Sequence, residues 1–447
     1  ATTAQFAKFL TTGRQINLLP QPGILPDVAM SDDFEVGGKA TWNYYPTYEA
    51  YESLMAQFQA TYPALCLFTP IATLASGRKL LVAKISDNVA ANEAEPEFLY
   101  SSSMHGDETT GYILMLHLID YLLANYGSNA EITNLVNSLE IYIAPLANPD
   151  GTYYGGNSSV CGAIRYYANG VDLNRNYPDP QNGQHPDGNA WQAETIAFMD
   201  FATAHHFSMG ANFHGGIELV NYPWDTWATL AADDNWWYFV SREYVDTVHL
   251  HSPTTYMDDE NNGVTNGYAW YEANGGRQDY MNYFHNCREV TIELSATKLL
   301  PAAQLETHWN YNYRSFILYL KQALYGIQGT ITDGSTGLPI QAQVFIAGHD
   351  IHNSQVYSAV PNGDYHRYLK AGTYELTVSA SGYQTLLIPN VVVNDRATTN
   401  LNIQLWPAPA DPVSFSATSV GTNQINLSWA KNAANNDVMV VWSTSSI

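Results

Sequence analysis

A histidine and a glutamate stand three positions apart, at His105 and Glu108, in the stretch 98–123, which reads FLYSSSMHGDETTGYILMLHLIDYLL. The stretch begins with an apolar run typical of a buried strand and continues with the apolar spacing of a helix. The pair therefore falls in a strand-to-helix loop, where open α/β sheets hold their ligands. Imidazole and carboxylate are both common zinc ligands. An isolated pair of this kind is more often a solvated turn, so other residues must support a metal site.

Two further residues have types that zinc chemistry uses. His214 directly follows an apolar run and precedes two glycines, so its ring can leave the end of a strand with little hindrance. With His105 and Glu108 it would form a two-histidine, one-carboxylate zinc site with a fourth position open to water. Glu293 lies inside the apolar run 290–294. Burying a carboxylate there is costly unless something uses it.

Two arginines could supply positive charge near this group. Arg165 and Arg175 are two of only 18 basic residues, and both lie in polar loops near predicted strand ends. Guanidinium groups beside a zinc site can bind a carboxylate and a developing oxyanion. The sequence thus contains both a candidate metal site and candidate groups for binding negative charge.

Alternating strands and helices between residues 44 and 325 must position these residues. This alternation predicts one α/β domain with a mostly parallel or mixed sheet. Beyond the strand and helix of 98–123, the apolar spacing predicts helices at 44–63, 132–139, 192–206, 236–249 and 305–325, and strands at 80–85, 141–145, 209–213 and 289–294.

The pattern changes after Tyr325. Short runs now alternate apolar and polar residues between turn-forming residues, which predicts a small all-β sandwich over 326–406. The runs lie at 327–333, 342–346, 372–379 and 401–405. A proline-rich linker follows at 407–412, and 413–447 begin another β pattern that is too short for a full sandwich. Residues 1–43 are predicted to wrap the surface as an extension.

Composition excludes some functions and favours an extracytoplasmic location. The chain has 447 residues, of which 46% are hydrophobic, enough for two or three domains with sizeable cores. Its net charge of −24 argues against nucleic acid as a partner. The 32 tyrosines and 11 tryptophans, with few lysines or arginines, favour a secreted or cell-surface protein. No apolar run reaches transmembrane length, and a numbering that begins at Ala1 indicates a mature or trimmed product.

The three cysteines, Cys66, Cys161 and Cys287, lack the spacing of a thiolate metal site. One disulfide with one thiol left over is an open alternative, and Cys161 and Cys287 are the candidate pair.

Six ordered motifs give the chain a family resemblance. They are HGDE at 105–108, NPDG at 148–151, DLNRNYPD at 172–179, HGG with NYPWD within 214–225, NGYAWYEANGGRQDYMNY at 266–283 and TIELS at 291–295. Over about 45–406 the chain resembles metallocarboxypeptidases of the carboxypeptidase A/B superfamily. It is most similar to the regulatory branch, carboxypeptidases N, E, M and D, in which a transthyretin-like β-sandwich follows the catalytic domain.

The resemblance implies roles in catalysis for five residues. His105, Glu108 and His214 would bind one zinc ion. Glu293 would be the general base that activates the water at the metal. Arg165 would polarise the scissile carbonyl and hold its oxyanion.

The resemblance also implies roles in substrate binding. Asn174, Arg175 and Tyr271 would bind the terminal carboxylate of a peptide, which makes such an enzyme an exopeptidase. Asp225 lies where basic-specific relatives place an acidic residue, which implies a preference for C-terminal Lys or Arg. Asp172 would accept a hydrogen bond from His105 and orient its ring.

The chain departs from the family pattern at two positions. HGDE replaces the usual HGNE, and GGRQD replaces GGMQD. Arg277, in the second motif, would stand near a pocket meant for cations and weaken the preference for Lys or Arg.

Four further interpretations accompany the expected monomeric zinc exopeptidase. One alternative is a carboxypeptidase of peptidoglycan stem peptides, and another is a non-catalytic binding member of the family. The sandwich is expected to support folding or structure. The segment 413–447 resembles the first strands of a fibronectin type III module, which indicates a secreted or surface-attached bacterial protein.

Overall fold

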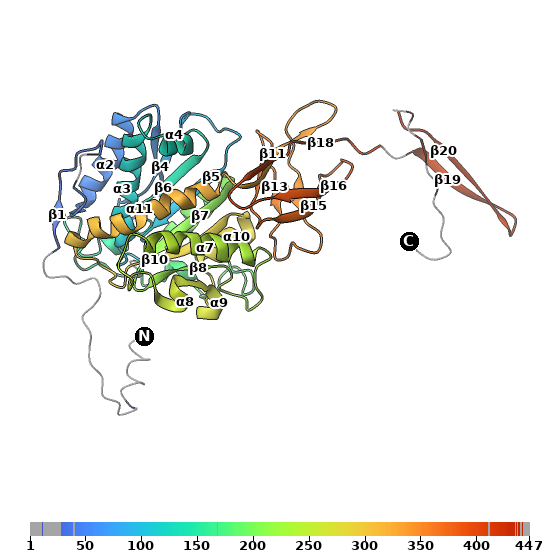
Figure 1. Cartoon of the computed structure of the whole chain (residues 1–447). Coiled ribbons are helices and arrows are strands. Elements are labelled where there is room, and N and C mark those ends of the chain that lie inside the picture. The colour runs from blue at the N-terminus through green and yellow to red at the C-terminus, as the bar shows by residue number, and fades with distance from the viewer. Residues whose placement is uncertain are drawn as a thin grey trace.

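The computed structural model describes residue 11, residues 28–38, 41–167, 169–409 and 412–433, and residues 435, 437, 438 and 440. These residues form an α/β domain, a β-sandwich and a β-hairpin along the chain (Figure 1). The extension predicted for 1–43 and the β pattern predicted near 438–447 lie partly outside the described residues.

An eight-stranded mixed sheet runs through the α/β domain in the order β3-β4-β6-β5-β7-β10-β8-β9. Its strands are β3 (Cys66–Thr73), β4 (Lys79–Ile85), β5 (Glu97–Ser102), β6 (Glu140–Ala144), β7 (Phe207–His214), β8 (Glu218–Tyr222), β9 (Val264–Asn266) and β10 (Arg288–Leu294). The central strands β6, β5, β7 and β10 are parallel, while β3–β4, β4–β6 and β10–β8 pair antiparallel. The predicted α/β domain with a mixed sheet is confirmed.

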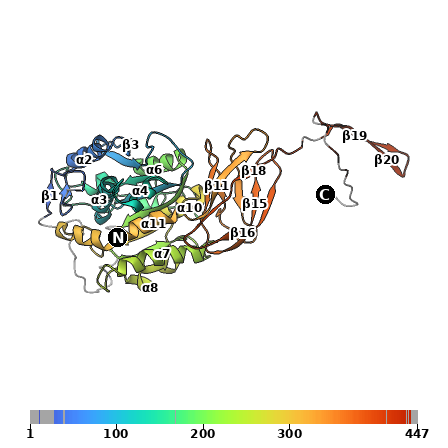
Figure 2. The same cartoon turned by 45° about the horizontal axis from the view of Figure 1, so that its top comes forward.

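Helices cover both faces of the sheet because alternate residues of its strands point to opposite sides. In β4, Leu81 and Ile85 join the core formed with α2 (Tyr48–Thr61), α3 (Thr110–Asn125), α4 (Ala130–Val136), α7 (Asp234–His249) and α11 (Leu305–Gln322). Leu80 and Val82 join the opposite core with α6 (Ala193–Ala204) and α10 (Arg277–His285). Figures 1 and 2 show α7 and α11 side by side on the first face.

Short elements complete this domain. They are β1 (Met30–Ser31), β2 (Tyr45–Pro46), α5 (Pro149–Thr152), η1 (Leu173–Arg175), α8 (Asp259–Gly263), α9 (Gly267–Trp270) and η2 (Ala302–Gln304). The described part of the N-terminal extension packs on the domain: Trp42 is buried, and the backbone N–H groups of Gly37 and Gly38 donate to the Asp120 carboxylate at 2.7 and 2.9 Å.

The sandwich contains two four-stranded sheets. One holds β11 (Gly326–Asp333), β14 (Asp364–Arg367), β17 (Thr398–Asn400) and β18 (Ile403–Leu405), and the other holds β12 (Gln343–Phe345), β13 (Val356–Tyr357), β15 (Gly372–Ser379) and β16 (Leu386–Val393). Arg367 on β14 is fully buried and pairs with Asp233 at 2.8 Å, which also pairs with Arg288 of β10 at 3.0 Å. Buried charges therefore join the sandwich to the α/β domain.

A hairpin follows the sandwich, with β19 (Val413–Val420) antiparallel to β20 (Gln424–Ala430). Figures 1 and 2 place it away from the sandwich, and almost all of its residues are exposed. Its identity as the start of a fibronectin type III module stays a prediction.

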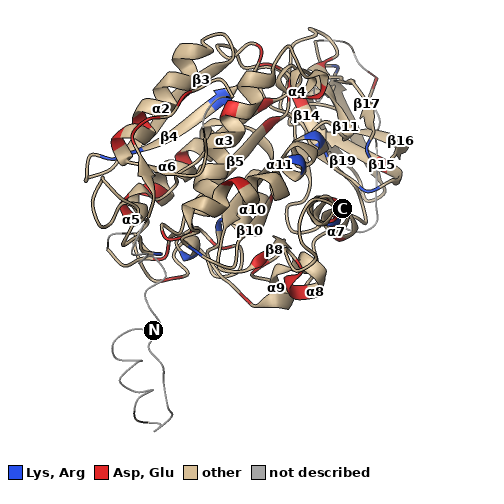
Figure 3. Ribbon diagram, turned by 60° about the vertical axis from the view of Figure 1, so that its left-hand side comes forward, with Lys and Arg blue, Asp and Glu red and all other residues tan. Residues whose placement is uncertain are grey.

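Two further properties belong to the whole described chain. Acidic residues occur on many elements and basic ones on few, in accordance with the net charge of −24 (Figure 3). No helix among the described residues has both the length and the apolar character needed to cross a membrane.

The structure does not contain the Cys161–Cys287 disulfide left open as an alternative, since the two cysteines are not bonded to each other among the described residues. Cys287 is fully buried in the core beside α10, while Cys161 lies in the loop after α5. The two thiols therefore belong to different parts of the domain.

Candidate metal site

Three predicted metal ligands converge at the carboxyl ends of β5 and β7. His105 and Glu108 lie in the loop between β5 and α3, and His214 is the last residue of β7. Glu108 Oε2 lies 2.9 Å from His105 Nδ1 and 2.8 Å from His214 Nδ1, and the two Nδ1 atoms are 3.0 Å apart. All three residues are buried. We call these residues the His–Glu–His group.

The outer nitrogen of each imidazole is held by a second residue. His105 Nε2 lies 3.0 Å from Asp172 Oδ1, and His214 Nε2 lies 2.9 Å from the side-chain amide of Asn212. These contacts fix both rings with Nδ1 toward Glu108. Such contacts orient metal-binding histidines in proteins. The structure thus places Asp172 where its predicted role requires it.

The two carboxylate oxygens of Glu108 have different surroundings. Oε2 faces the imidazoles and also accepts from the backbone N–H of Gly215 at 3.2 Å. Oε1 faces Lys298 Nζ at 2.5 Å and Arg165 Nη1 at 3.3 Å. Burial opposes ionisation of Glu108, but the two imidazoles outweigh it and hold its pKa well below the usual range. Glu108 is therefore an ionised carboxylate.

The donor set fits zinc. Burial lowers the pKa of His214 to about 4, so its imidazole is neutral and can donate a lone pair. Burial also acts to lower the pKa of His105, but Glu108 and Asp172 outweigh it and raise that pKa. Two imidazole nitrogens and one carboxylate oxygen, aimed at one point, are the three protein ligands typical of a catalytic zinc site.

Glu293 approaches the same group from a third parallel strand. It lies on β10 and is the register partner of His214 on β7. Its Oε2 atom is buried and has no hydrogen-bond partner among the residues that the structure describes. Burial, and secondarily the charge of Glu108, raise the pKa of Glu293 well above its usual value. A higher pKa makes the ionised carboxylate a stronger base, so it can accept a proton from a nearby water molecule.

Cationic and aromatic groups predicted to bind substrate lie together. Arg175 Nη1 donates to the carbonyl of Asn174 at 2.6 Å, and the Arg175 guanidinium lies 6.0 Å from the ring centre of Tyr271. Among the described residues, Arg175 forms no ion pair with a carboxylate. Asn174 Oδ1 accepts from the backbone N–H of Arg277 at 2.9 Å. Arg175 is thus a fixed guanidinium whose charge is available to a ligand.

Asp225 lies in the turn after β8, buried among polar side chains. Its Oδ1 accepts from the amides of Asn221 at 2.9 Å and Gln278 at 3.2 Å. A Cβ added at Gly276 would lie 3.5 Å from Asp225 Oδ2 and 3.7 Å from Asn174 Oδ1. The lack of a side chain at Gly276 therefore keeps room between the Asp225 carboxylate and the Asn174 amide.

A second carboxylate supports the backbone at Asp225. The N–H groups of Asp225 and Thr226 both donate to Asp279, at 3.0–3.1 Å and 2.8 Å. Burial raises the pKa of Asp225 to about 6, and burial followed by the charge of Asp225 raises that of Asp279 well above its usual value. Burial thus favours the neutral form of both carboxyl groups, and of Asp279 the more strongly. We call Asp225, with the room that Gly276 leaves beside it, the Asp225 pocket.

Residues 51–315 match the zinc carboxypeptidase family, and residues 326–406 match the carboxypeptidase regulatory-like domain. The chain belongs to the zinc carboxypeptidase family. The predicted resemblance, including the β domain that follows, is confirmed. The domain boundaries and the roles of individual residues stay predictions.

Relatives of this zinc carboxypeptidase include carboxypeptidases D and M of Mus musculus. Carboxypeptidase D is 35% identical over 382 residues, which cover 80% of this chain and 27% of that protein. Carboxypeptidase M is 32% identical over 366 residues, which cover 77% of this chain and 80% of that protein. The chain thus spans about a quarter of carboxypeptidase D.

Two solved structures share the fold. Carboxypeptidase A from Helicoverpa armigera gives a TM-score of 0.55 at 18% identity, covering 64% of this chain and 75% of that one. Thrombin activatable fibrinolysis inhibitor gives a TM-score of 0.55 at 18% identity, covering 64% and 76%.

The structure corrects one expectation about this zinc carboxypeptidase. Arg277 does not present its charge to the Asp225 pocket, because its guanidinium is buried against Glu289 at 2.7 Å and Ser101. Three further residues of the site, Lys298, Gln278 and Asn212, were not predicted from the sequence. Gln278 is the one with a sequence signal, since it lies within the GGRQD motif beside Arg277.

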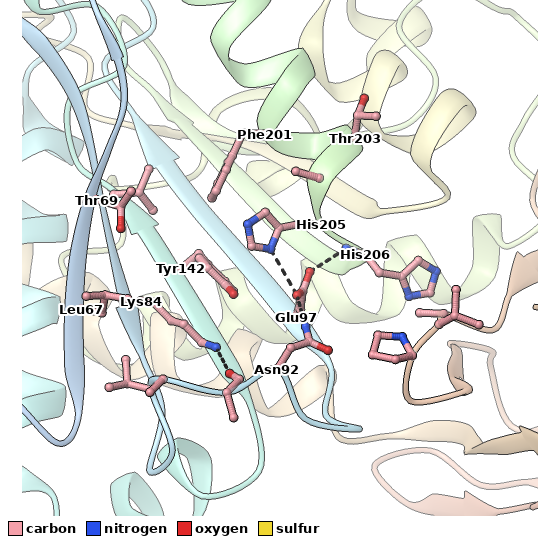
Figure 4. A pocket seen from close by; sticks show the side chains of 18 of the residues that line it. Leu67, Thr69, Lys84, Asn92, Glu97, Tyr142, Phe201, Thr203, His205 and His206 are labelled. Carbon is pink, nitrogen blue, oxygen red and sulfur yellow. Dashed lines mark hydrogen bonds and ion pairs between the residues drawn. The ribbon is translucent and has the colours of Figure 1, made fainter. Parts of the chain in front are cut away.

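A cavity of about 740 Å³ lies elsewhere, between β4–β6, the end of α6 and the sandwich (Figure 4). Its charged residues have partners: Lys84 pairs with Glu140 at 3.0 Å, and Glu97 lies 3.2 Å from His205 Nδ1. None of the residues that line it belongs to the His–Glu–His group. The candidate site rests on converging donor atoms and not on cavity size.

Proposed function

We propose that this chain is a zinc-dependent exopeptidase that removes single residues from the C-termini of peptides or proteins and prefers Lys or Arg at the terminus. The observation that carries the proposal is a metal-type donor group together with an unpaired guanidinium. The His–Glu–His group would hold zinc, and Arg175, beside Tyr271, has no carboxylate partner among the described residues. A peptide C-terminus supplies the carboxylate that such a guanidinium binds.

Zinc held by this group would polarise the scissile carbonyl and acidify a water molecule. Glu293 takes a proton from the attacking water, because its buried Oε2 has no competing partner. The same carboxyl group then returns the proton to the leaving amine. Arg165 is held by Asp172 at 2.9 Å and can donate to the oxygen that gains charge.

Binding of the terminal carboxylate explains the restriction to chain ends. Arg175 and Tyr271 bind a substrate by its last carboxylate, so the peptide bond next to that carboxylate is the one presented to Glu293. An internal segment of a protein offers no carboxylate at this place. The predicted activity is therefore exopeptidase and not endopeptidase.

The acidic pocket supports the preference for Lys or Arg. Asp225 is ionised at neutral pH, since burial raises its pKa only to about 6. Asp179 adds negative charge beside it, since its charge contributes to the raised pKa of Asp225. Arg277, the cation that would oppose this preference, is neutralised by Glu289.

Hydrolysis of matched peptides ending in Arg, Lys, Leu or Glu tests the proposal, with and without a zinc chelator. We expect chelator-sensitive release of Arg and Lys, with much slower release of Leu and Glu. Preferred release of Leu would remove Asp225 as the selector. If no peptide were cleaved while zinc was bound, the proposal would fail. Muropeptides and a peptide-binding assay would then test the stem-peptide and binding-protein alternatives.

A further inference from the structure

The Asp225 loop, residues 223–227, carries two tryptophans that flank the acidic side chain. Trp224 is buried, and its ring meets Trp227 edge-on at 5.2 Å between centres. Trp227 also meets Tyr283 of α10 at 5.6 Å. The loop that holds Asp225 therefore packs against α10 through aromatic rings.

A residue of the β-sandwich packs on these two tryptophans. His352 lies in the segment between β12 and β13, and its ring stacks on Trp227 with 4.3 Å between centres and 23° between planes. It also meets Trp224 edge-on at 6.2 Å. Its buried Nδ1 has no hydrogen-bond partner within the described part of the chain, and burial lowers the pKa of the ring. His352 thus contacts the loop through its ring, and its lowered pKa favours the neutral form.

The sandwich segment is anchored beside this contact. Asn353 donates from Nδ2 to the Tyr283 carbonyl at 3.3 Å, and its own carbonyl accepts from Asn286 Nδ2 at 2.6 Å. The Ser354 carbonyl accepts from Arg288 Nη2 at 2.6 Å. Three hydrogen bonds therefore fix the segment to α10 and β10.

The conformation of the segment is specific as well. His352 and Asn353 have φ values of 50° and 58°, in the left-handed region that few side chains favour. The ring position at residue 352 therefore depends on an uncommon backbone conformation that the three hydrogen bonds hold. A ring held in this way can restrict the movement of Trp227.

Asp225 lies between the two supported tryptophans in the chain. Its backbone N–H and that of Thr226 donate to the Asp279 carboxylate. The loop is therefore held both by these hydrogen bonds and by the stack of His352 on Trp227. A shift of Trp227 would be transmitted over two residues to the Asp225 side chain.

We propose that the β-sandwich positions the specificity pocket through His352, whose stack on Trp227 holds the Asp225 loop. The inference rests on the proposed function, because it assigns Asp225 to a basic terminal side chain. His352 is a positioning residue, and the sandwich is then more than a support for folding.

Two substitutions of His352 separate the effect of its ring from the effect of its backbone conformation. His352→Asn keeps a residue that tolerates the left-handed conformation and removes the ring, while His352→Phe keeps a ring. Asn362→Ala is the matched control, since Asn362 contacts Asn92 of the α/β domain at 2.6 Å without touching the Asp225 loop. An aromatic stack of this kind corresponds to about a two- to tenfold change in an equilibrium.

We expect H352N to raise KM for peptides ending in Arg or Lys about two- to tenfold with little change in kcat. We expect a smaller rise in H352F, which keeps a ring but strains the left-handed backbone, and N362A should resemble the unmodified protein. An unchanged KM in H352N would overturn the proposal. So would equal losses in H352F and H352N, because the ring would then not be the cause.

Hydrogen exchange of the Asp225 and Thr226 amides tests the positioning without any substrate. We expect faster exchange in H352N, a smaller increase in H352F and unchanged exchange in N362A. If the unmodified protein released no basic residue, the proposed function would fail, but this exchange would still decide whether His352 holds the loop. Unchanged exchange in H352N would show that it does not.

Discussion

Glu293 and His214 are register partners on the adjacent parallel strands β10 and β7. Residues paired in this way project to the same side of a sheet. Glu293 is therefore placed beside the His–Glu–His group by the pairing of two central strands and not by a mobile loop. The sheet itself therefore positions the side chain that we propose as the proton acceptor.

Replacing Glu293 by Gln should remove the proton acceptor and keep the shape of the side chain. We expect kcat for an Arg-terminated peptide to fall by about 10²- to 10⁴-fold, the usual range for a general acid–base group. Bound zinc, measured by elemental analysis, should be retained, because Glu293 is not a member of the donor group. A turnover close to that of the unmodified protein would remove Glu293 from the mechanism.

Asp172 should affect the affinity for zinc because it holds the outer nitrogen of His105 at 3.0 Å. We expect Asp172→Ala to weaken zinc binding about 10- to 100-fold, as measured by competition with a chromogenic chelator. Asp246→Ala is the control, since Asp246 is a surface carboxylate that pairs with Arg242 at 2.8 Å. Equal zinc affinities in the two variants would show that Asp172 does not orient His105.

The pKa of Asp225 predicts a pH dependence that differs between substrates. Burial raises this pKa to about 6, so the carboxyl group becomes neutral as the pH falls through that value. We expect kcat/KM for Arg-terminated peptides to drop below about pH 6 relative to kcat/KM for Leu-terminated peptides. The ratio of the two kcat/KM values is used because titration of catalytic groups shared by both substrates affects both values equally. In Asp225→Asn the ratio should be low and independent of pH, and a step near pH 6 in that variant would assign the titration to another group.

The sequence allowed prediction where a residue type and its local pattern carry the information. His105, Glu108 and His214 stand at ends of apolar runs, and the period of those runs predicts the strands and helices around them. β3 escaped prediction because it is an edge strand with little burial and contains Pro70, which only an edge strand tolerates well.

Contacts between distant segments could not be predicted from local patterns. Lys298 reaches Glu108 across 190 positions of chain, and His352 reaches Trp227 from another domain. The charge of Arg277 was misjudged for the same reason, because its partner Glu289 lies on the next strand. The extracytoplasmic location stays a prediction.

The buried pair of Arg277 and Glu289 leads to a prediction about stability. Both side chains are almost fully buried, and no described residue forms a hydrogen bond with Glu289 Oε1. Arg277 is therefore the main compensation for this carboxylate. We expect Arg277→Met to lower the free energy of unfolding by about 3–5 kcal/mol, because it leaves an unpaired buried charge.

The double variant Arg277→Met with Glu289→Gln removes both charges, so urea unfolding should show most of that loss recovered. The guanidinium does not face the Asp225 pocket, and KM of the folded double variant for Arg-terminated peptides should stay near that of the unmodified protein. If the double variant were as unstable as Arg277→Met, unpaired charge would not be the cause. A clear fall in its KM would instead place Arg277 in the pocket, where its positive charge opposes a basic side chain.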